Sequence, residues 1–360
     1  MSFIETIDLS QRFNSKSILE GINLRIEKGE VFAVIGPSGA GKTTLLRLIG
    51  LIDKSVSGKI LFDGVDTDQP EKLRLELRRR LAFLQQKPVL FSGSVYENVA
   101  YGLKCRGVAK DVIQKKVAES LELVGLSGYE NRGARTLSGG EAQRIAIARS
   151  VILKPEVLIL DELTANLDPL STAKIESLIE GIIARHDTTI VMSTHDMIQG
   201  QRLADRIGVL IDGELLQTGR ASEVFTLPEN KDVAEFVGVE NILPGLVTAS
   251  SEGMITLDAG FGHVIEAVAD YPVGEKVYAF MRPEDIVLSL VRTSTSARNS
   301  CAGAISRVIP KGPTALIEIN CGFRLVVLVT RRSVDGMGLA PGREVFASFK
   351  ATAIHVVKRS

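Results

Sequence analysis

The stretch GPSGAGKTT, residues 36–44, decides the fold of this chain. An apolar run at 31–35 leads directly into it and a run with helical spacing follows at 45–49, so the pattern predicts a strand, a glycine-rich loop and a helix. The spacing G-x-x-x-x-G-K-[ST] is typical of a loop that wraps a polyphosphate, because the glycines let backbone N–H groups turn inward and the helix N-terminus is electropositive. Lys42 is then expected to reach the terminal phosphates, and the Thr43 hydroxyl to bind magnesium. The expected nucleotide-binding residues of the loop are Gly36, Pro37, Ser38, Gly39, Ala40, Gly41, Lys42, Thr43 and Thr44.

Length and composition predict a globular protein of two or three domains. The chain has 360 residues, of which 45% are hydrophobic and 24% are charged. Lys and Arg together number 43, as do Asp and Glu, so net charge gives no reason to expect a nucleic-acid partner. No apolar stretch approaches the roughly 20 residues of a membrane-spanning helix, and the acidic start does not resemble a signal peptide. A membrane role would therefore come through a partner. The scattered Cys105, Cys301 and Cys321 are expected to be free thiols in a reducing cytoplasm.

The segments flanking the glycine loop add further candidates for the nucleotide site. Phe13 lies ahead of the loop, where its ring could stack on adenine, although a phenylalanine of the core is the alternative. The run 81–84 predicts a buried strand that ends at Gln85, whose carbonyl could ligate magnesium and report on the γ-phosphate. Residues 94 to about 136 carry apolar positions at three and four spacing, which predicts a helical insertion.

A second phosphate-binding sequence, LSGGE, opens a long amphipathic helix at residues 137–141. Ser138, Gly139 and Gly140 would present exposed N–H groups at the start of that helix. One nucleotide does not easily need two such sites from one subunit. We therefore expect a head-to-tail homodimer, in which each ATP lies between the glycine loop of one subunit and the LSGGE sequence of the other.

Two carboxylates and a histidine follow the next predicted strands. The buried run VLILDE ends in Asp161, expected to hold magnesium through water, and in Glu162, expected to orient or deprotonate the attacking water. The run 190–194 is the following strand, and it leads to His195, which could contact the γ-phosphate. The predicted catalytic residues are therefore Glu162, His195 and Gln85, and the predicted magnesium ligands are Thr43, Gln85 and Asp161.

This ordered set of motifs resembles the ATP-binding cassette (ABC) transporter ATPases over roughly residues 1–235. The resemblance implies an α/β P-loop NTPase fold with the helical insertion at about 94–136, ATP and Mg²⁺ as cofactors, and the residue roles given above. It also implies that Asn166, Leu167 and Asp168 lie in the dimer interface. Leu163, Asn166 and Phe13 depart from the usual proline, alanine and tyrosine of the family, but none of these departures removes a catalytic group.

The remainder of the chain carries an internal repeat. VGEKVYAFMRPEDI at 273–286 parallels PGREVFASFKATAI at 341–354, and Asn241-x-x-x-Gly245 parallels Asn299-x-x-x-Gly303. Helical patterning stops near residue 235 and short β-rich stretches take over. We therefore expect an all-β C-terminal region of two related small OB-like barrels, a TOBE-like one at 241–290 and a Mop-like one at 296–358.

The second barrel resembles the Mop domain, which binds molybdate or tungstate. The stretches that carry the resemblance are SARN at 296–299, VTRRS at 329–333, GLAPG at 338–342 and FKAT at 349–352. From the residues alone, the Ser-, Thr- and Arg-rich junction before this barrel is either a solvated linker or an anion site. The resemblance implies an oxyanion site between subunits, formed by Ser296, Arg298, Asn299, Lys350, Ala351 and Thr352. The alternative is a barrel that only stabilises the dimer.

These resemblances imply the ATP-hydrolysing subunit of an oxyanion importer, most simply one for molybdate or tungstate. It would work as a homodimer on the cytoplasmic face of the membrane, bound there through two membrane-spanning permease subunits and served indirectly by a solute-binding protein. Importers for sulfate, phosphate, iron or a polyamine remain the alternative, because their ATPases resemble this chain over the first 235 residues. A cassette protein that acts on ribosomes or DNA is a third alternative, but such proteins usually carry two cassettes or a long coiled-coil insertion, and this sequence shows neither. As a fourth, the C-terminal barrels are an oxyanion storage or sensing module fused to the ATPase.

Overall fold

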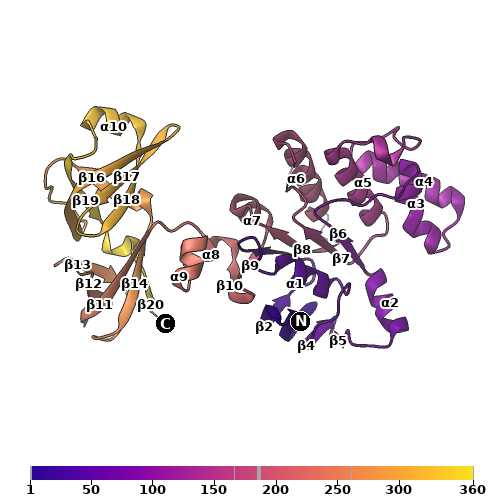
Figure 1. Cartoon of the computed structure of the whole chain (residues 1–360), viewed down its shortest axis with the longest axis horizontal. Helices are drawn as coiled ribbons and strands as arrows, with labels where there is room; N and C mark the ends of the chain where they lie inside the picture. The colour runs from indigo at the N-terminus through magenta and orange to yellow at the C-terminus, as the bar shows by residue number, and fades with distance from the viewer. Residues whose placement is uncertain (1, 166, 185–187, 261, 360) are drawn as a thin grey trace. The chain divides into compact units, whose positions relative to one another are not determined.

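The structure is a computed structural model, and it describes residues 2–165, 167–184, 188–260 and 262–359. The chain divides into two compact units, one that ends at Val224 and one that begins at Phe225 (Figure 1). Helix α8 (Ala221–Thr226) contains the point of division. Within the described residues, no helix has the length and apolar character needed to cross a membrane. The sequence-based domain boundaries at residues 235, 241–290 and 296–358 remain predictions.

A six-stranded sheet forms the centre of the first unit, as the apolar runs predict. Its order is β10-β9-β3-β8-β7-β6, with parallel pairing except between β9 and β10. Strands β3, β7 and β8 are buried at every position, which explains their continuous apolar sequences, because both faces of a parallel sheet are covered. The bounds are β3 Val31–Ile35, β6 Leu81–Leu84, β7 Val157–Asp161, β8 Thr189–Thr194, β9 Arg206–Ile211 and β10 Glu214–Arg220.

The strand ends of this sheet bring the predicted catalytic segments together. The pairing register places Ile35 of β3 opposite Thr194 of β8, and Asp161 of β7 opposite Ser193 of β8. Helix α1 (Lys42–Ile49) begins directly after the glycine loop, and its buried Leu45, Leu46, Leu48 and Ile49 belong to the main core of the unit. The carboxyl edge of the sheet is therefore the place where the loop and the carboxylates meet.

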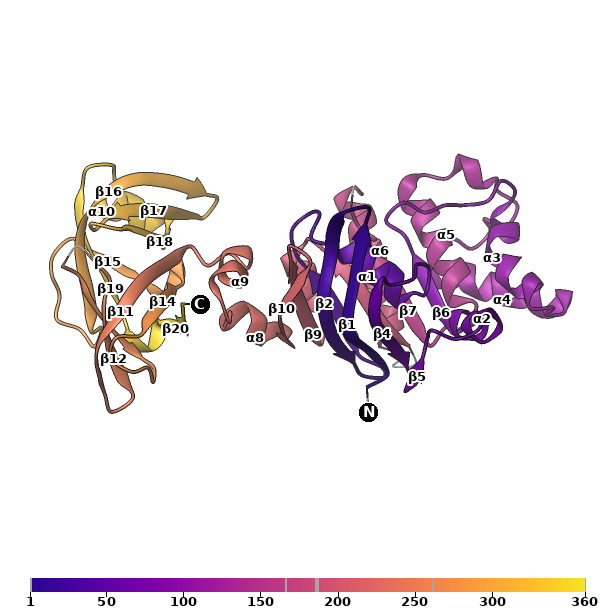
Figure 2. The same cartoon turned by 60° about the horizontal axis from the view of Figure 1, so that its bottom comes forward.

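A second, antiparallel sheet and a group of helices complete the first unit. The sheet has the order β2-β1-β4-β5, and its strands contribute to the same core as α1. Figure 2 shows α3, α4 and α5 grouped beyond β6, and α3 and α4 lie within the predicted helical insertion. The bounds are β1 Ile4–Phe13, β2 Lys16–Ile26, β4 Ser57–Phe62, β5 Val65–Asp66, α2 Glu71–Arg79, α3 Val95–Cys105, α4 Lys110–Leu123, α5 Gly139–Val151, α6 Pro169–Ile183 and α7 Met197–Leu203.

The second unit is β-rich, and its two sequence repeats form corresponding elements. After α9 (Lys231–Phe236), the first repeat gives β11 Asn241–Ser251, β12 Met254–Asp258, β13 Val264–Val268, β14 Lys276–Met281, the 3₁₀ turn Pro283–Asp285 and β15 Val287–Ser289. The second gives β16 Asn299–Lys311, β17 Thr314–Asn320, β18 Arg324–Thr330, α10 Arg331–Met337, β19 Glu344–Phe349, the 3₁₀ turn Ala351–Ala353 and β20 His355–Lys358. The predicted repeat is confirmed as an all-β pair with an added helix in the second half.

The two halves exchange their last strands. Strand β20 joins the first sheet, whose order is β13-β12-β11-β14-β20, while β15 joins the second, whose order is β15-β19-β16-β17-β18. One hydrophobic core accordingly contains residues of both halves, such as Val277 and Val345. Because each sheet needs a strand from the other repeat, the halves form one intertwined body.

Candidate functional site

The glycine loop wraps around a buried lysine. Gly41 has a φ of 105°, in the left-handed region that favours glycine, and it directly precedes the first residue of α1. Gly36 lies against the neighbouring strand, where an added Cβ would stand 2.0 Å from the carbonyl oxygen of Leu210. The Lys42 side chain is 4% exposed, and its Nζ donates to the carbonyl oxygens of Gly36 at 2.9 Å and Pro37 at 3.0 Å. The loop thus carries a fixed cation at its centre.

The other predicted loop residues differ in their exposure. Ser38, Gly39 and Thr43 are exposed, Thr44 is half-buried, and Ala40 packs into the core. The hydroxyl of Thr43 donates to Oδ1 of Asp161 at 3.0 Å, which joins the loop to the end of β7. Hydroxyl and carboxylate oxygens are ligands that Mg²⁺ prefers, so this donor pair fits the expected ion.

Glu162 is the centre of the second part of the site. Its Oε1 lies 3.4 Å from Nζ of Lys42, and its Oε2 lies 3.4 Å from Nδ1 of His195. Nε2 of Gln86 reaches the same Oε2 at 3.5 Å. The His195 side chain is 57% exposed, so it can meet both this carboxylate and a ligand from solvent. The structure therefore brings together the loop lysine, the carboxylate and the histidine that the sequence predicted.

The glutamine that contacts Glu162 is Gln86, and the sequence analysis predicted Gln85 as the catalytic glutamine. Gln85 is exposed, while Gln86 is half-buried and in reach of Glu162. The reason is the alternation of side chains along an extended chain, because Ala82 and Leu84 point inward and Gln86 continues that series. Gln85 stays the predicted catalytic and magnesium-binding glutamine, and its contact with Glu162 makes Gln86 a further candidate.

Phe13 and the LSGGE sequence lie on the surface of the same unit. The Phe13 side chain is 51% exposed at the end of β1, so it is not part of the core. Ser138 caps α5 through a reciprocal capping box, with its Oγ accepting from the N–H of Glu141 and Glu141 accepting from the N–H of Ser138. These hydrogen bonds from Ser138 hold the pKa of Glu141 below its ordinary value.

The predicted interface turn lies beside the LSGGE helix. A Cβ on Gly139 would meet Cδ2 of Leu167 at 3.7 Å, and one on Gly140 would meet Oγ of Ser171 at 2.6 Å. Asp168 caps α6 by accepting from the N–H of Ser171 at 2.9 Å. Asn166 lies outside the described residues. Among those that are described, no hydrogen bond or ion pair joins Ser138, Gly139 or Gly140 to the glycine loop within one chain.

The C-terminal candidates occupy different places in the second unit. Ser296 and Lys350 line a cavity of about 410 Å³, together with Glu284 and Asp285. Burial and the neighbouring Glu284 raise the pKa of the Asp285 carboxyl. Thr352 lines an adjoining cavity of about 710 Å³, which Lys350 also reaches. The cavities therefore combine hydroxyl, cationic and acidic groups.

Arg298, Asn299 and Ala351 do not line either cavity. The Arg298 side chain is 71% exposed, and its Nε lies 3.9 Å from Oε2 of Glu266. Asn299 is 2% exposed, and its amide exchanges two hydrogen bonds with the backbone of Glu266, at 2.8 and 2.9 Å. Ala351 is buried. Asn299 thus holds the two halves together within this chain, a role that the resemblance did not predict.

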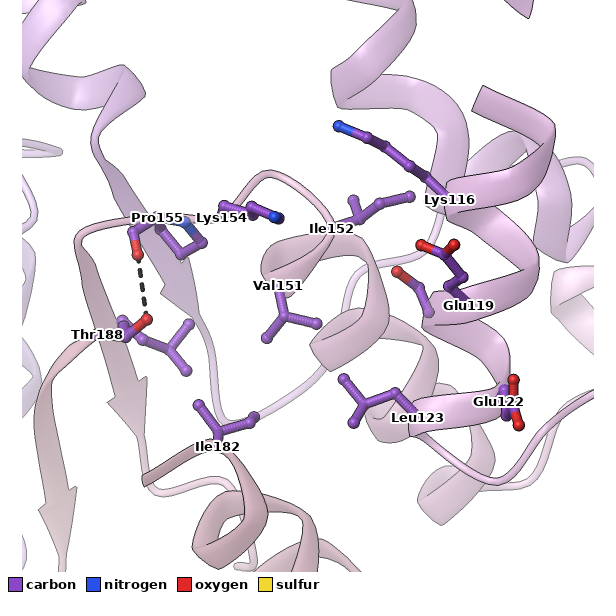
Figure 3. Close-up of a pocket in the computed structure, with 12 residues that line it drawn as sticks. Lys116, Glu119, Glu122, Leu123, Val151, Ile152, Lys154, Pro155, Ile182 and Thr188 are labelled. Atoms are coloured by element: carbon purple, nitrogen blue, oxygen red, sulfur yellow. Dashed lines mark hydrogen bonds between the residues drawn. The ribbon is translucent and has the colours of Figure 1, made fainter. Parts of the chain in front are cut away.

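A separate cavity of about 640 Å³ lies between α4 and the segment that follows α5 (Figure 3). Its lining includes Lys116, Glu119, Ile152, Lys154 and Pro155, and none of the predicted site residues. Pro155 precedes β7, so this cavity lies toward the end of the strand opposite Asp161. It is therefore distinct from the nucleotide site.

Comparison with known proteins agrees with the geometry. The ABC transporter family matches residues 19–165, and the TOBE domain matches residues 295–356. A molybdate/tungstate import ATP-binding protein of Pyrococcus abyssi is 37% identical over 94% of this chain and 95% of its own length. A spermidine/putrescine import ATP-binding protein of Spiroplasma citri is 33% identical over 99% of this chain and 97% of its own.

Two solved structures resemble the first unit. The cbiO1 protein of Clostridium perfringens, part of an ABC transporter complex, has a TM-score of 0.58 at 34% identity and covers 62% of this chain and 90% of its own. A dimeric ATP-binding cassette with bound ADP and phosphate, in a post-hydrolysis state, has a TM-score of 0.56 at 28% identity, covering 61% of this chain and 98% of its own. The chain has a TOBE domain, and it belongs to the ABC transporter family as an importer ATP-binding subunit, which couples ATP hydrolysis to transport.

Proposed function

We propose that this subunit powers the import of molybdate or tungstate. The observation that carries the proposal is the similarity to molybdate/tungstate import ATP-binding proteins across both units of the chain. A relative that shared only the ATPase unit would say little about the solute, because that unit is common to importers of many kinds. The polyamine importer subunits cover the chain equally well, so a polyamine is the second candidate.

The catalytic assignments follow from the contacts around Glu162. Lys42 would neutralise the terminal phosphates. Thr43, Gln85 and Asp161 would hold Mg²⁺, which would supply charge neutralisation at the reacting phosphoryl group. Glu162 orients the attacking water and accepts its proton, while His195 and Gln86 hold the carboxylate from the other side. Phe13 provides a face on which adenine stacks.

We further propose that two subunits form a head-to-tail dimer. Its support is the exposed N-terminus of α5, where Ser138 and Gly139 face solvent, and the neighbouring Leu167 and Asp168. Each ATP would then contact the glycine loop of one subunit and LSGGE of the other. The interface closes on itself because the same two surfaces meet twice.

The permease would contact the surface near the helical insertion. Phe91 and Tyr101 are exposed there although their rings pack at 4.7 Å between centroids, and the guanidinium of Arg149 lies 5.3 Å from the Phe91 ring centre. Exposed aromatic groups beside a half-buried arginine are typical of protein interfaces. Through two permease subunits the ATPase would sit on the cytoplasmic face of the membrane and receive solute from a separate binding protein.

The C-terminal cavities give the oxyanion a candidate regulatory site. Lys350 and Ser296 could donate to a dianion, while the acidic Glu284 and Asp285 in the same cavity favour a cation and so agree better with the polyamine candidate. Arg298 is exposed and could join an anion site completed by a second subunit. Bound ligand would regulate transport only if it favoured one state of the dimer over the other.

Calorimetric titration of the full chain separates these candidates. Tungstate, molybdate, sulfate and spermidine are titrated into wild type, Lys350→Ala and Arg298→Ala, with Lys311→Ala as a control for an exposed lysine of the same unit. We expect binding heat with tungstate and molybdate and weaker binding of sulfate. Lys350→Ala and Arg298→Ala should each lose at least about tenfold in affinity for tungstate and molybdate. Heat with spermidine alone would transfer the proposal to a polyamine, and no heat with any ligand would leave the unit a dimerisation and stability element.

A further inference from the structure

We propose that Ser193 is a positioning residue for ATP hydrolysis, which fixes Asp161 and Glu162 in one arrangement. The inference rests on the roles proposed above for these two carboxylates. Ser193 lies on β8, one residue before the end of the strand, and its side chain is 1% exposed. A hydroxyl buried this completely needs partners, and both of its partners belong to the catalytic segment.

The hydroxyl of Ser193 contacts both carboxylate residues. It donates to Oδ1 of Asp161 at 2.7 Å and accepts from the backbone N–H of Glu162 at 3.1 Å. The same N–H also approaches the carbonyl oxygen of Ser193 at 3.2 Å. One small side chain therefore bridges two consecutive residues of the neighbouring strand end.

This bridge matters for Asp161 because the hydroxyls of Thr43 and Ser193 donate to the same carboxylate oxygen. Thr43 and Ser193 donate to Oδ1, and among the described residues neither of them donates to Oδ2. The carboxylate is thereby held in one rotamer, with one oxygen committed to the protein and the other available to a hydrated cation. A hydrogen bond to an ionised carboxylate is stronger than one between neutral groups, so Ser193 restricts this rotamer effectively.

Glu162 depends on the bridge for its backbone conformation. Its φ is 44°, in the left-handed region that non-glycine residues rarely adopt. Such a conformation persists where surrounding contacts over-determine it, and the shared hydrogen bond to Ser193 is such a contact. Its side chain is aimed from that backbone at Lys42 and His195. Loss of the Ser193 hydroxyl would therefore release the side chain of Asp161, which is proposed to bind the cation, and the backbone of Glu162, which is proposed to orient the attacking water.

The test compares Ser193→Ala with Thr189→Val, a matched variant on the same strand. Thr189 is also 1% exposed, and its Oγ1 accepts from the N–H of Gly29 at 2.9 Å, at the end of β8 away from the carboxylates. Both variants lose one buried hydroxyl. We expect Ser193→Ala to lower kcat by about tenfold with little change in KM for ATP, because a charge-assisted hydrogen bond is lost at the reacting centre.

A second measurement does not depend on turnover. Binding of a fluorescent ATP analogue to the full chain is titrated with Mg²⁺ and with Mn²⁺, and Ser193→Ala should need about tenfold more of either cation for half of its effect. Ser193→Thr keeps the hydroxyl and should restore the wild-type response. Thermal unfolding without nucleotide is measured in parallel, and there Thr189→Val should lose as much stability as Ser193→Ala.

If Ser193→Ala matches Thr189→Val in kcat and in cation dependence, the positioning role is wrong. A Ser193→Thr variant that folds but behaves like Ser193→Ala would also overturn it. Asp161→Asn separates this failure from failure of the proposed catalytic assignments. Hydrolysis lost in Asp161→Asn but unchanged in Ser193→Ala refutes only the role of Ser193, whereas hydrolysis unchanged in both refutes the site itself.

Discussion

The two units use their sequence motifs in opposite ways. In the ATPase unit, side chains from separate motifs converge on one point, where Lys42 and His195 both lie 3.4 Å from Glu162. In the C-terminal unit, the repeated asparagines bind backbone groups of the opposite half. Asn241 exchanges hydrogen bonds with Val326, and Asn299 does so with Glu266. A motif residue can thus belong to the proposed reaction centre in one unit and connect the two halves in the other.

The difference has a physical origin in the two topologies. Parallel strands place all of their carboxyl ends at one edge of a sheet, so polar residues that follow the strands must gather there. The intertwined β unit has no such edge, and its exchanged strands require fixed contacts between the halves. Its asparagines satisfy buried backbone groups that would otherwise lack partners.

The largest effect is expected from Glu162→Gln in the ATPase unit. Hydrolysis should fall by about 10²–10⁴-fold, because the residue acts on the attacking water, while ATP binding stays nearly intact. The variant should accumulate as an ATP-bound dimer, measured by gel filtration with ATP. The matched control is Glu156→Gln, a carboxylate near the other end of the same strand that pairs with Arg80 at 2.6 Å. An unaltered rate in Glu162→Gln would show that convergence at this point does not mark the reaction centre.

The next effect concerns the sharing of a site between subunits. Lys42→Ala should weaken ATP binding by about tenfold or more, because the phosphates lose a buried cationic partner. Ser138→Arg should leave nucleotide binding by the monomer intact but block closure of the dimer. Mixed in equal amounts, the two should recover activity in about a quarter of the composite sites, since half of the dimers are mixed and each keeps one intact site.

The control mixture combines Lys42→Ala with Glu162→Gln. Both changes lie on the same side of the composite site, so no dimer in this mixture keeps an intact one. Recovery in the first mixture and none in the second supports the head-to-tail arrangement. No recovery in either, or equal recovery in both, would contradict it.

Sequence reasoning could predict which residues meet at the proposed ATPase site because the signals are local. The motifs stand directly after predicted strands, so their meeting at one sheet edge follows from the fold class, and Lys42, Thr43, Asp161, Glu162 and His195 lie where expected. It predicted Gln85 and did not consider Gln86, which contacts Glu162, because the alternation along β6 was not followed beyond the strand. Ser193 was missed because it lies within a fully buried strand, where the sequence does not distinguish its hydroxyl from those of Thr189 and Thr194.

The C-terminal unit shows where such reasoning stops. The repeat predicted two related halves, but the exchange of β15 and β20 depends on pairing between strands far apart in the chain. No local pattern distinguishes a terminal strand that returns to its own sheet from one that joins the other. The role of Asn299 could not be read from SARN for the same reason, because its partner Glu266 belongs to the other repeat.

The smallest expected effect is on the stability of the C-terminal unit. Asn241→Ala and Asn299→Ala each leave buried backbone groups without partners, so each should lower the free energy of unfolding of this unit by about 2 kcal/mol. Asn320→Ala is the matched control, since Asn320 is exposed and its side-chain Oδ1 accepts from the N–H of Gly322 in a turn. Urea unfolding followed by hydrogen exchange of the β-rich segments measures the changes, while ATP hydrolysis should stay at its wild-type rate. Comparable losses of unfolding free energy in Asn241→Ala and Asn299→Ala would show that the two repeated asparagines contribute equally to stability. A large loss of ATP hydrolysis with no loss of stability would instead show that these asparagines contribute to ATPase activity and not to stability.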